Sequence, residues 1–315
     1  MAAQAIPQQT PIAPRKGLLA RAIKLVKKPQ FWFGLFVLLP TAIWYILFAY
    51  RPIVQSFRMA VVDYRLIKPE TSPFVGLQNF RTLFAYHYFP IAVKNTITYA
   101  LMVNIGMLPT AMIVSFCLAN VVKGRPIYQW ALFTPVVVSM IAVALLFRTL
   151  LDPQIGVFNQ ILASLGLPKC KFLTGPDTAM PTIVAIDIWK NLGTYVVLLT
   201  AGLLNIPEEM YDAAKVDGAN GWQIFWRITL PLLSYTLTLV VILLSINALQ
   251  VYSSALVLTG GGPGTRTYMI NLLIMAEAFG NFRFGLATAA AFCLFLAIMA
   301  ITLIQLRVTR ASWQY

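Results

Sequence analysis

The sequence predicts an all-α membrane protein with six transmembrane helices. Its 315 residues are 59% hydrophobic and only 11% charged, and the mean hydropathy is +0.75. Soluble domains average about 25% charged residues, so this composition is typical of membrane proteins. Six apolar runs reach the length of about 20 residues that is needed to cross a bilayer. Each run is expected to be a helix, because an isolated span must satisfy its own backbone hydrogen bonds.

The six predicted spans lie in one transmembrane domain, residues 29–310. A flexible, basic segment (1–28) precedes this domain and a short tail (311–315) follows it. Prolines inside the runs do not argue against helices, because membrane helices tolerate them. In chain order, the spans are predicted at residues 31–50, 95–122, 127–150, 181–204, 232–258 and 284–306.

Basic residues predict the orientation. A cluster directly before the first span marks the cytoplasmic side. An even number of spans then places both termini, and the segment between spans four and five, in the cytoplasm. The other cations of this chain, whose net charge is +14, are scattered over loops, so no nucleic-acid partner is expected. The members of the cluster are Arg15, Lys16, Arg21, Lys24, Lys27 and Lys28.

The sequence does not favour an enzyme. It contains one histidine, His87, and three cysteines without CxxC spacing, so no metal site is indicated. A lipid-linked glycosyltransferase would need a DxD or metal motif, and neither DxD nor HExxH occurs. The G-x-x-x-x-G-K-[ST] phosphate loop is also missing, so this chain is not expected to hydrolyse ATP.

The segment 205–231 interrupts the apolar sequence with a short amphipathic stretch. Pro207, Glu208 and Glu209 predict a helix start, because a proline in the first turn and acids near the positive end of the dipole are favourable there. Gly218 is placed to end or bend this helix. From the residues alone, the segment is either an interfacial helix anchored by Trp222 and other aromatics or a docking site for a soluble partner.

This segment resembles the cytoplasmic EAA loop of ABC-importer permeases. The family pattern has an acid, two alanines, a spaced glycine and a later I-x-L-P; Asp212 stands here where glutamate is usual. The stretches 258–264 (LTGGGPG) and 74–80 (FVGLQNF) are similar to loops of the MalF-like subunits of carbohydrate importers. The residues expected to couple to an ATPase are Asp212, Ala213, Ala214, Asp217, Gly218, Ile228, Leu230 and Pro231.

The resemblance implies a MetI-like type I permease fold in the bacterial cytoplasmic (inner) membrane. The implied partners are a second permease subunit, two ATPase subunits and an extracytoplasmic sugar-binding protein, besides membrane lipid. The chain itself is expected to hold no cofactor, since ATP and Mg belong to the ATPase subunits. A secondary transporter is the more distant alternative; such proteins often contain an inverted repeat, and none is visible here.

Polar residues in two spans predict a substrate pathway, because ionisable residues in a span usually face a cavity or a partner. Span four carries Asp187, Lys190, Asn191 and Thr194, and span five carries Asn247, Gln250 and Ser254 at helical spacing. The resemblance points instead to Leu244, Ala248 and Ser253 on span five. Trp189, Tyr195 and Tyr252 are candidates either for stacking on sugar rings or for ordinary packing.

The charges in span four have two readings. A buried lysine suits an acidic oligosaccharide such as a uronate, or a phosphorylated polyol such as glycerol 3-phosphate. The alternative is that Asp187 and Lys190, three residues apart on one helix face, neutralise each other.

Overall fold

The computed structural model describes residues 28–120 and 124–308, and this part of the chain is helical apart from loops and one isolated bridge between Val62 and Phe74. Residues 1–27 of the predicted flexible segment and the predicted tail 311–315 lie outside the described residues. The helices of the described residues confirm the all-α prediction. In chain order, the elements are α2 (Pro29–Tyr45), η1 (Ile46–Tyr50), α3 (Arg51–Ala60), η2 (Pro69–Thr71), α4 (Gln78–Ala85), α5 (Tyr88–Ala119), α6 (Arg125–Val137), α7 (Met140–Leu150), α8 (Val157–Ser164), α9 (Ala179–Leu204), α10 (Glu208–Val216), α11 (Gly221–Ile224), η3 (Phe225–Thr229), α12 (Leu230–Leu232), α13 (Ser234–Leu249), α14 (Ser253–Thr259), α15 (Ile270–Met275), η4 (Ala276–Gly280) and α16 (Phe284–Val308).

The chain divides into two compact units, up to Ser56 and from Phe57 onward. The first span belongs mainly to the first unit. It extends from Pro29 to Ala60 and is therefore longer than the predicted 31–50. A wide π-helical turn, η1, interrupts its α-helical pattern. Pro52, just beyond this turn, has no N–H for the carbonyl of Phe48, which accounts for the locally altered hydrogen bonding.

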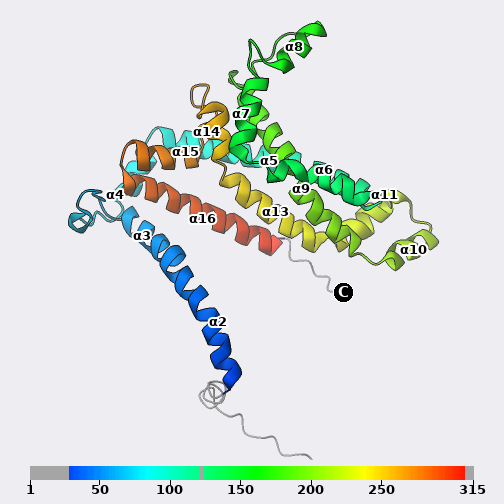
Figure 1. The fold of residues 1–315 in the computed structure, drawn as a ribbon, viewed down its shortest axis with the longest axis horizontal. Coiled ribbons are helices and arrows are strands. Elements are labelled where there is room, and N and C mark those ends of the chain that lie inside the picture. The colour runs from blue at the N-terminus through cyan, green and yellow to red at the C-terminus, as the bar shows by residue number, and fades with distance from the viewer. Residues whose placement is uncertain (1–27, 121–123, 309–315) are drawn as a thin grey trace, which may run out of the picture. The chain divides into compact units, whose positions relative to one another are not determined.

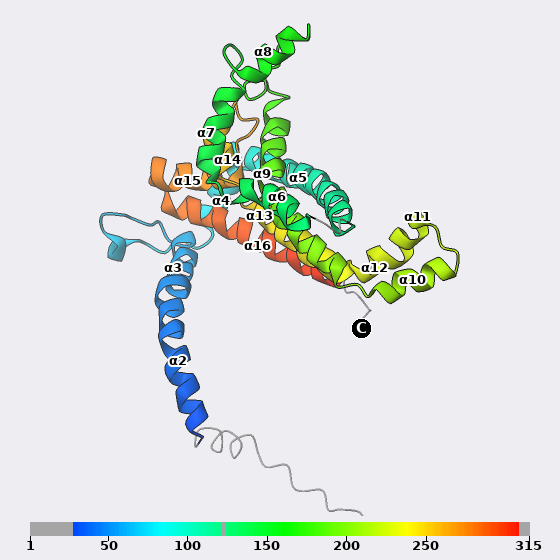
Figure 2. The same cartoon turned by 45° about the vertical axis from the view of Figure 1, so that its right-hand side comes forward.

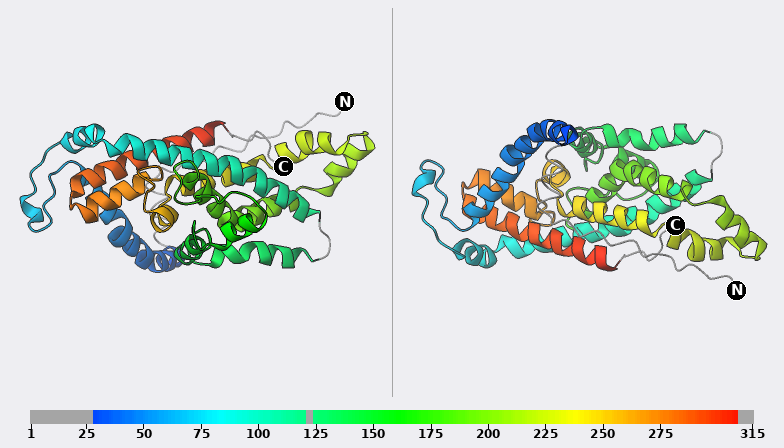
Figure 3. Two further views of the ribbon diagram at one scale, coloured as in Figure 1. Left: turned by 90° about the horizontal axis from the view of Figure 1, so that it is seen from above. Right: turned by 90° about the horizontal axis from the view of Figure 1, so that it is seen from below.

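Helix α9 is the centre of the second unit. It packs along α5 on one side and α6 on the other, and both views in Figure 3 show it between these two helices. Helices α13 and α14 also contact α9, while α16 packs on α4, α13 and α15 (Figure 1). The core between α5 and α9 is apolar and includes Met107, Ile183, Val196 and Leu199, all almost fully buried. This packing gives α9 one face toward each neighbour, which positions the site.

The described part has four helices long and apolar enough to cross a membrane, or up to six if each of two bent pairs is one span. Spans two, four and six follow the predictions closely as α5, α9 and α16. Helix α5 begins seven residues before the predicted start because Phe89 and Ala92 pack in a second core with Leu83. The predicted end of span two, at residues 121–122, lies outside the described residues.

The third predicted span, 127–150, is not one continuous helix. It breaks between α6 and α7, which meet at 89°. Val138 is extended and Ser139 precedes the first turn of α7. Pro135 contributes to the break, because it removes one hydrogen bond from the final turns of α6 and its ring crowds the preceding turn.

The fifth predicted span, 232–258, is also interrupted. Helix α13 meets the preceding helical segment 221–232 at 70° and ends at Leu249, and a separate helix, α14, starts at Ser253. The Val251 carbonyl between them accepts a hydrogen bond from the Asn271 side chain at 3.2 Å. A side chain from a distant part of the chain therefore stabilises this interruption.

Side-chain contacts fix the loops around the start of α5 and before α16. The side chain of Asn79 donates to the carbonyls of Ala60 and Val62. Glu277, which is 1% exposed, accepts from the Tyr86 hydroxyl at 2.8 Å and lies 3.4 Å from Arg283. These contacts tie the start of α5 to the turn between η4 and α16.

Candidate functional site

A polar cavity of about 330 Å³ lies in the second unit, bordered by α5, α7, α9, α13 and α14. Nine of the ten residues named for the substrate pathway line it, including Leu244, Ala248 and Ser253, to which the family resemblance pointed. The lining residues are Tyr99, Val103, Met107, Met140, Asp187, Lys190, Asn191, Thr194, Tyr195, Leu244, Asn247, Ala248, Val251, Tyr252, Ser253 and Ser254.

Asp187 and Lys190 both line this cavity and are buried, with 5% and 7% of their surface exposed. The carboxylate of Asp187 accepts a short hydrogen bond from the hydroxyl of Tyr99 on α5. Among the ion pairs of residues 28–120 and 124–308, none joins Asp187 to Lys190. The structure therefore gives the carboxylate a tyrosine partner and does not show the direct neutralisation that the helical spacing suggested.

The ammonium of Lys190 donates to a backbone carbonyl, that of Val136 in α6, at 3.2 Å. An ammonium has three N–H donors. No other acceptor for them is found within the described part of the chain. Lys190 interacts electrostatically with Asp187 without forming an ion-pair contact with it in the described residues. Ionisable residues buried in a span usually face a cavity or a partner, and Lys190 faces the polar cavity.

Two amides extend the polar lining. Asn247 donates to the Tyr195 hydroxyl at 3.2 Å, and Asn191 donates to the backbone carbonyl of Asp187 at 3.0 Å. Gln250 was predicted on the same stripe but is exposed and does not line the cavity. The reason is that α13 ends at Leu249, so helical spacing no longer relates Gln250 to Asn247.

Tyr99 is the partner that sequence reasoning missed. It lies in an apolar run, and one hydroxyl there gives little signal. Tyr99, Val103 and Met107 follow each other at intervals of four residues and all line the cavity, so they mark one face of α5. A search for this spacing opposite the polar stripe of span four could have found it.

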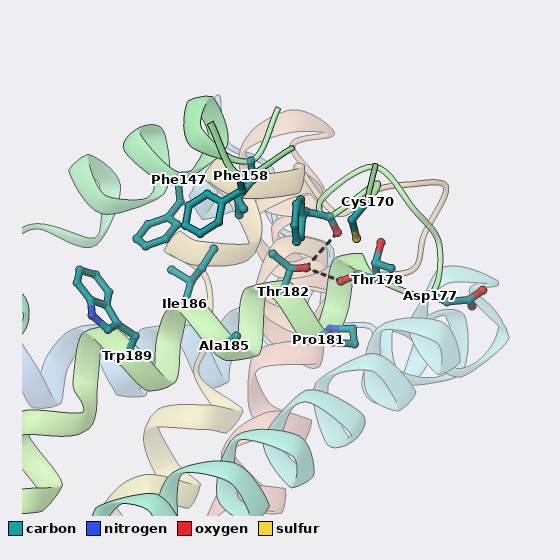
Figure 4. Close-up of a pocket in the computed structure, with 12 residues that line it drawn as sticks. Phe147, Phe158, Cys170, Asp177, Thr178, Pro181, Thr182, Ala185, Ile186 and Trp189 are labelled. Carbon is teal, nitrogen blue, oxygen red and sulfur yellow. Dashed lines mark hydrogen bonds between the residues drawn. The ribbon is translucent and has the colours of Figure 1, made fainter. Parts of the chain in front are cut away.

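A larger cavity, of about 650 Å³, lies on another face of α9 and is almost entirely apolar. Trp189 points into it and its ring packs edge-on against Phe147, with centroids 5.4 Å apart (Figure 4). Trp189 is therefore placed away from the polar cavity, whereas Tyr195 and Tyr252 line that cavity. Size alone does not identify the functional site here, because this cavity offers few groups that could bind a polar ligand.

The segment 205–231 projects beyond the end of α9 as a pair of short helices, visible in Figure 2. Pro207 occupies the N-cap position of α10, and Gly218 follows its end with φ of +76°, a conformation that favours glycine. Asn220 and Gln223 then start α11 with reciprocal hydrogen bonds of 2.9 Å. Local sequence thus specifies both the turn and the two helices.

The predicted coupling residues divide between the surface and the base of this segment. Asp212, Ala213, Asp217 and Gly218 are exposed, and Asp212 pairs with Lys215 at 2.9 Å. Ala214 is buried; Ile228, Leu230 and Pro231 are half-buried and lie in η3 and α12. Apolar side chains are exposed beside the acids: Met210 (45%), Val216 (87%) and Trp222 (72%). An exposed mixture of apolar and charged groups is typical of a protein-docking surface.

Contacts at its base hold the segment against the bundle. The rings of Phe116 on α5 and Phe225 in η3 meet edge to face, 6.0 Å apart. Thr229 is fully buried and lies 3.4 Å from the Tyr211 hydroxyl. The segment is therefore packed on the membrane helices rather than loosely tethered.

The sequence model of the family described as "Binding-protein-dependent transport system inner membrane component" matches residues 122–313. The chain is 30% identical over 276 residues to the probable ABC transporter permease protein YurN of Bacillus subtilis, covering 86% of this chain and 94% of that protein. It is 33% identical over 282 residues to the trehalose/maltose transport system permease protein MalF of Thermococcus litoralis, covering 88% and 93%.

Two solved structures are similar to the whole fold. One is a bacterial alginate ABC transporter in complex with an alginate pentasaccharide-bound periplasmic protein, with a TM-score of 0.79 and 29% identity over 93% of this chain and 97% of that chain. The other is a bacterial ABC transporter involved in the import of the acidic polysaccharide alginate, with a TM-score of 0.81 and 28% identity over 94% and 99%.

Proposed function

The chain belongs to the family of binding-protein-dependent transport system inner membrane components, and from this premise we propose that it is the permease subunit of an ABC importer for acidic oligosaccharides, uronate oligosaccharides in particular. The observation that carries the substrate class is Lys190, a buried cation beside a polar cavity that makes no ion-pair contact with any carboxylate of residues 28–120 and 124–308. The similar solved transporters handle alginate, an acidic polysaccharide, which supports the same class.

The cavity offers the groups that a saccharide requires. A hydroxyl taken out of water needs a hydrogen-bond partner, and Asn191, Thr194, Asn247 and Ser253 supply donors and acceptors. Its volume of about 330 Å³ is near the lower end of ligand sites, so a short stretch of the chain occupies it at one time. In this reading Lys190 binds a sugar carboxylate and Asp187, held by Tyr99, accepts from hydroxyls.

ATP hydrolysis belongs to partner subunits in this proposal. The segment 205–231 docks on one of two ATPase subunits and moves with it when ATP closes them. A second permease completes the pathway, and an extracytoplasmic binding protein delivers the sugar. Both termini then lie in the cytoplasm. The transport step is a population shift between two states, driven by differential binding of ATP and binding protein. The family assignment argues against an ion-gradient-driven transporter.

A phosphorylated polyol such as glycerol 3-phosphate is the second candidate, because the same buried ammonium suits any compact anion. The two candidates differ in size and in the hydroxyl groups beside the anion. Uptake of both compounds should therefore be measured with the same preparation.

The test is uptake by the complete importer, reconstituted with its partner permease, ATPase subunits and binding protein. Lys190→Met should lower uptake of a uronate trisaccharide about 10- to 100-fold, because hydrogen bonds to charged groups contribute about 1.5–3 kcal/mol. Lys190→Arg should retain much of it. Lys94→Met, the same change at an exposed position of α5 outside the cavity, is the matched control. Unchanged uronate uptake by Lys190→Met would refute the proposal.

A further inference from the structure

The break between α6 and α7 exposes the end of a half-helix to Lys190. The last four carbonyls of an α-helix have no partner within the helix, and the C-terminal end carries partial negative charge. Helix α6 ends at Val137, so the carbonyl of Val136 is one of these four. It is the carbonyl that accepts from the Lys190 ammonium, at 3.2 Å. Lys190 thus caps the broken end of the third span.

A close backbone contact fixes this register. Gly193 lies one turn beyond Lys190 on α9, and a Cβ there would be 2.8 Å from the carbonyl carbon of Leu132 and 2.9 Å from Cα of Phe133. Leu132 lies one turn before Val136 on α6. The two helices therefore run antiparallel with Gly193 against Leu132 and Lys190 against Val136, so the cap position follows from the packing of α6 on α9.

The broken end also borders the polar cavity. Met140, the first residue of α7, lines it together with Lys190. The ammonium therefore lies between two possible acceptors: the Val136 carbonyl at the break and any anion in the cavity. Asp187 accepts a hydrogen bond from Tyr99 and forms no ion-pair contact with Lys190 in the part of the chain that the structure describes.

We propose that a substrate carboxylate displaces the Val136 carbonyl from Lys190, so that binding of an acidic sugar uncaps α6 and changes the angle at the α6–α7 break. This inference rests on the proposed acidic substrate. It assigns Lys190 a second role, as a positioning residue for the half-helix, and makes the break the element that senses an occupied cavity. A neutral sugar of the same size leaves the cap in place.

The test measures the distance across the break by electron spin resonance in the complete importer. Spin labels are attached at Ala131→Cys in α6 and Leu145→Cys in α7, both exposed, after replacement of the native Cys117, Cys170 and Cys293. A uronate trisaccharide should shift the distance distribution, and a neutral trisaccharide should not. Without substrate, Lys190→Met should already give the shifted distribution, and uronate should shift it no further.

Two further variants keep the result interpretable. Lys190→Arg retains a cation and its donors, so its distribution without substrate should match that of the labelled parent. Lys94→Met, outside the cavity, should also match it. If Lys190→Met and the parent share one substrate-free distribution, the cap does not control the break and the inference is overturned. A separate uptake assay on the parent shows whether uronates are transported at all, which distinguishes failure of the proposed function from failure of the cap.

Discussion

Gly193 provides a quantitative test of the packing that positions the polar cavity. In Gly193→Ala, the new Cβ would lie 2.8 and 2.9 Å from two backbone atoms of α6, and closer still to the Leu132 carbonyl oxygen. Carbon atoms are most stable about 3.5–4.0 Å apart, so α6 must withdraw by roughly 1 Å. Backbone atoms cannot rotate away as a side chain can, and overpacking of this kind costs about 1–3 kcal/mol.

The helix propensity of alanine opposes this cost, because glycine inside a helix is about 1 kcal/mol less favourable. A matched control removes this contribution. Gly34 lies in the interior of α2 and a Cβ there would meet nothing within 4 Å, so Gly34→Ala gains propensity without a clash. Gly193→Ala should therefore be about 1–3 kcal/mol less stable than Gly34→Ala.

The assay is reversible unfolding of the purified chain in mixed micelles, with the free energy of unfolding compared across three variants. Gly202→Ala should fall between the other two, because its Cβ would meet side-chain atoms of Thr236 and Leu233 that can adjust. Equal stability of Gly193→Ala and Gly34→Ala would refute the close contact between α6 and α9, and with it the register that brings Lys190 to Val136.

Three further predictions concern residues outside the membrane core. Gly218→Ala should reduce binding-protein-stimulated ATPase activity of the complete importer, because alanine at positive φ costs roughly 1–2 kcal/mol, whereas Gly221→Ala, with open space and no positive φ, should not. Burial, reinforced by the Glu277 carboxylate, raises the pKa of Tyr86 from 10.0 to about 12, so the folded state binds this proton more tightly. Stability should thus fall as the pH rises from about 10 to about 12, and Tyr86→Phe should lack this part of the decline when unfolding is followed against pH. The backbone N–H groups of Ile155 and Gln154 lower the pKa of Asp152 below 3.8. The ionised carboxylate therefore stabilises the fold above that pH, and this contribution is lost as the pH falls further. Asp152→Asn keeps an acceptor but does not titrate, so its free energy of unfolding should fall less steeply with decreasing pH in the acid range.

Hydropathy predicted spans two, four and six well, because it depends on residue type over many positions. The breaks at Val138 and after Leu249 could not be predicted in this way. Pro135 is compatible with a continuous membrane helix, and valine carries no signal for an interruption. Both breaks have partners distant in the sequence, Lys190 for one and Asn271 for the other, and these contacts exist only after folding.

The candidate site was likewise predictable where helical spacing applied and unpredictable where contacts between distant residues decide. The polar face of span four and two positions of span five, Asn247 and Ser254, could be found from spacing, and they lie together in the structure. Gln250 was misplaced because the spacing rule assumed helix beyond Leu249. The relation between Asp187 and Lys190 was also undecidable from spacing, since helix geometry places them on one face but says nothing of Tyr99, which comes from another helix.

Helix α9 runs without interruption from Lys190 to Leu204, and the short connection 205–207 joins it to α10. At 1.5 Å per residue, this stretch separates the cavity from the projecting segment by about 21 Å. Inserting or deleting one residue here would turn α10 by about 100° relative to Lys190 and move it by about 1.5 Å along the axis. Loops tolerate such changes in length and a buried helix does not. Among related chains, we therefore expect the number of residues between these two points to be constant even where the loops differ in length.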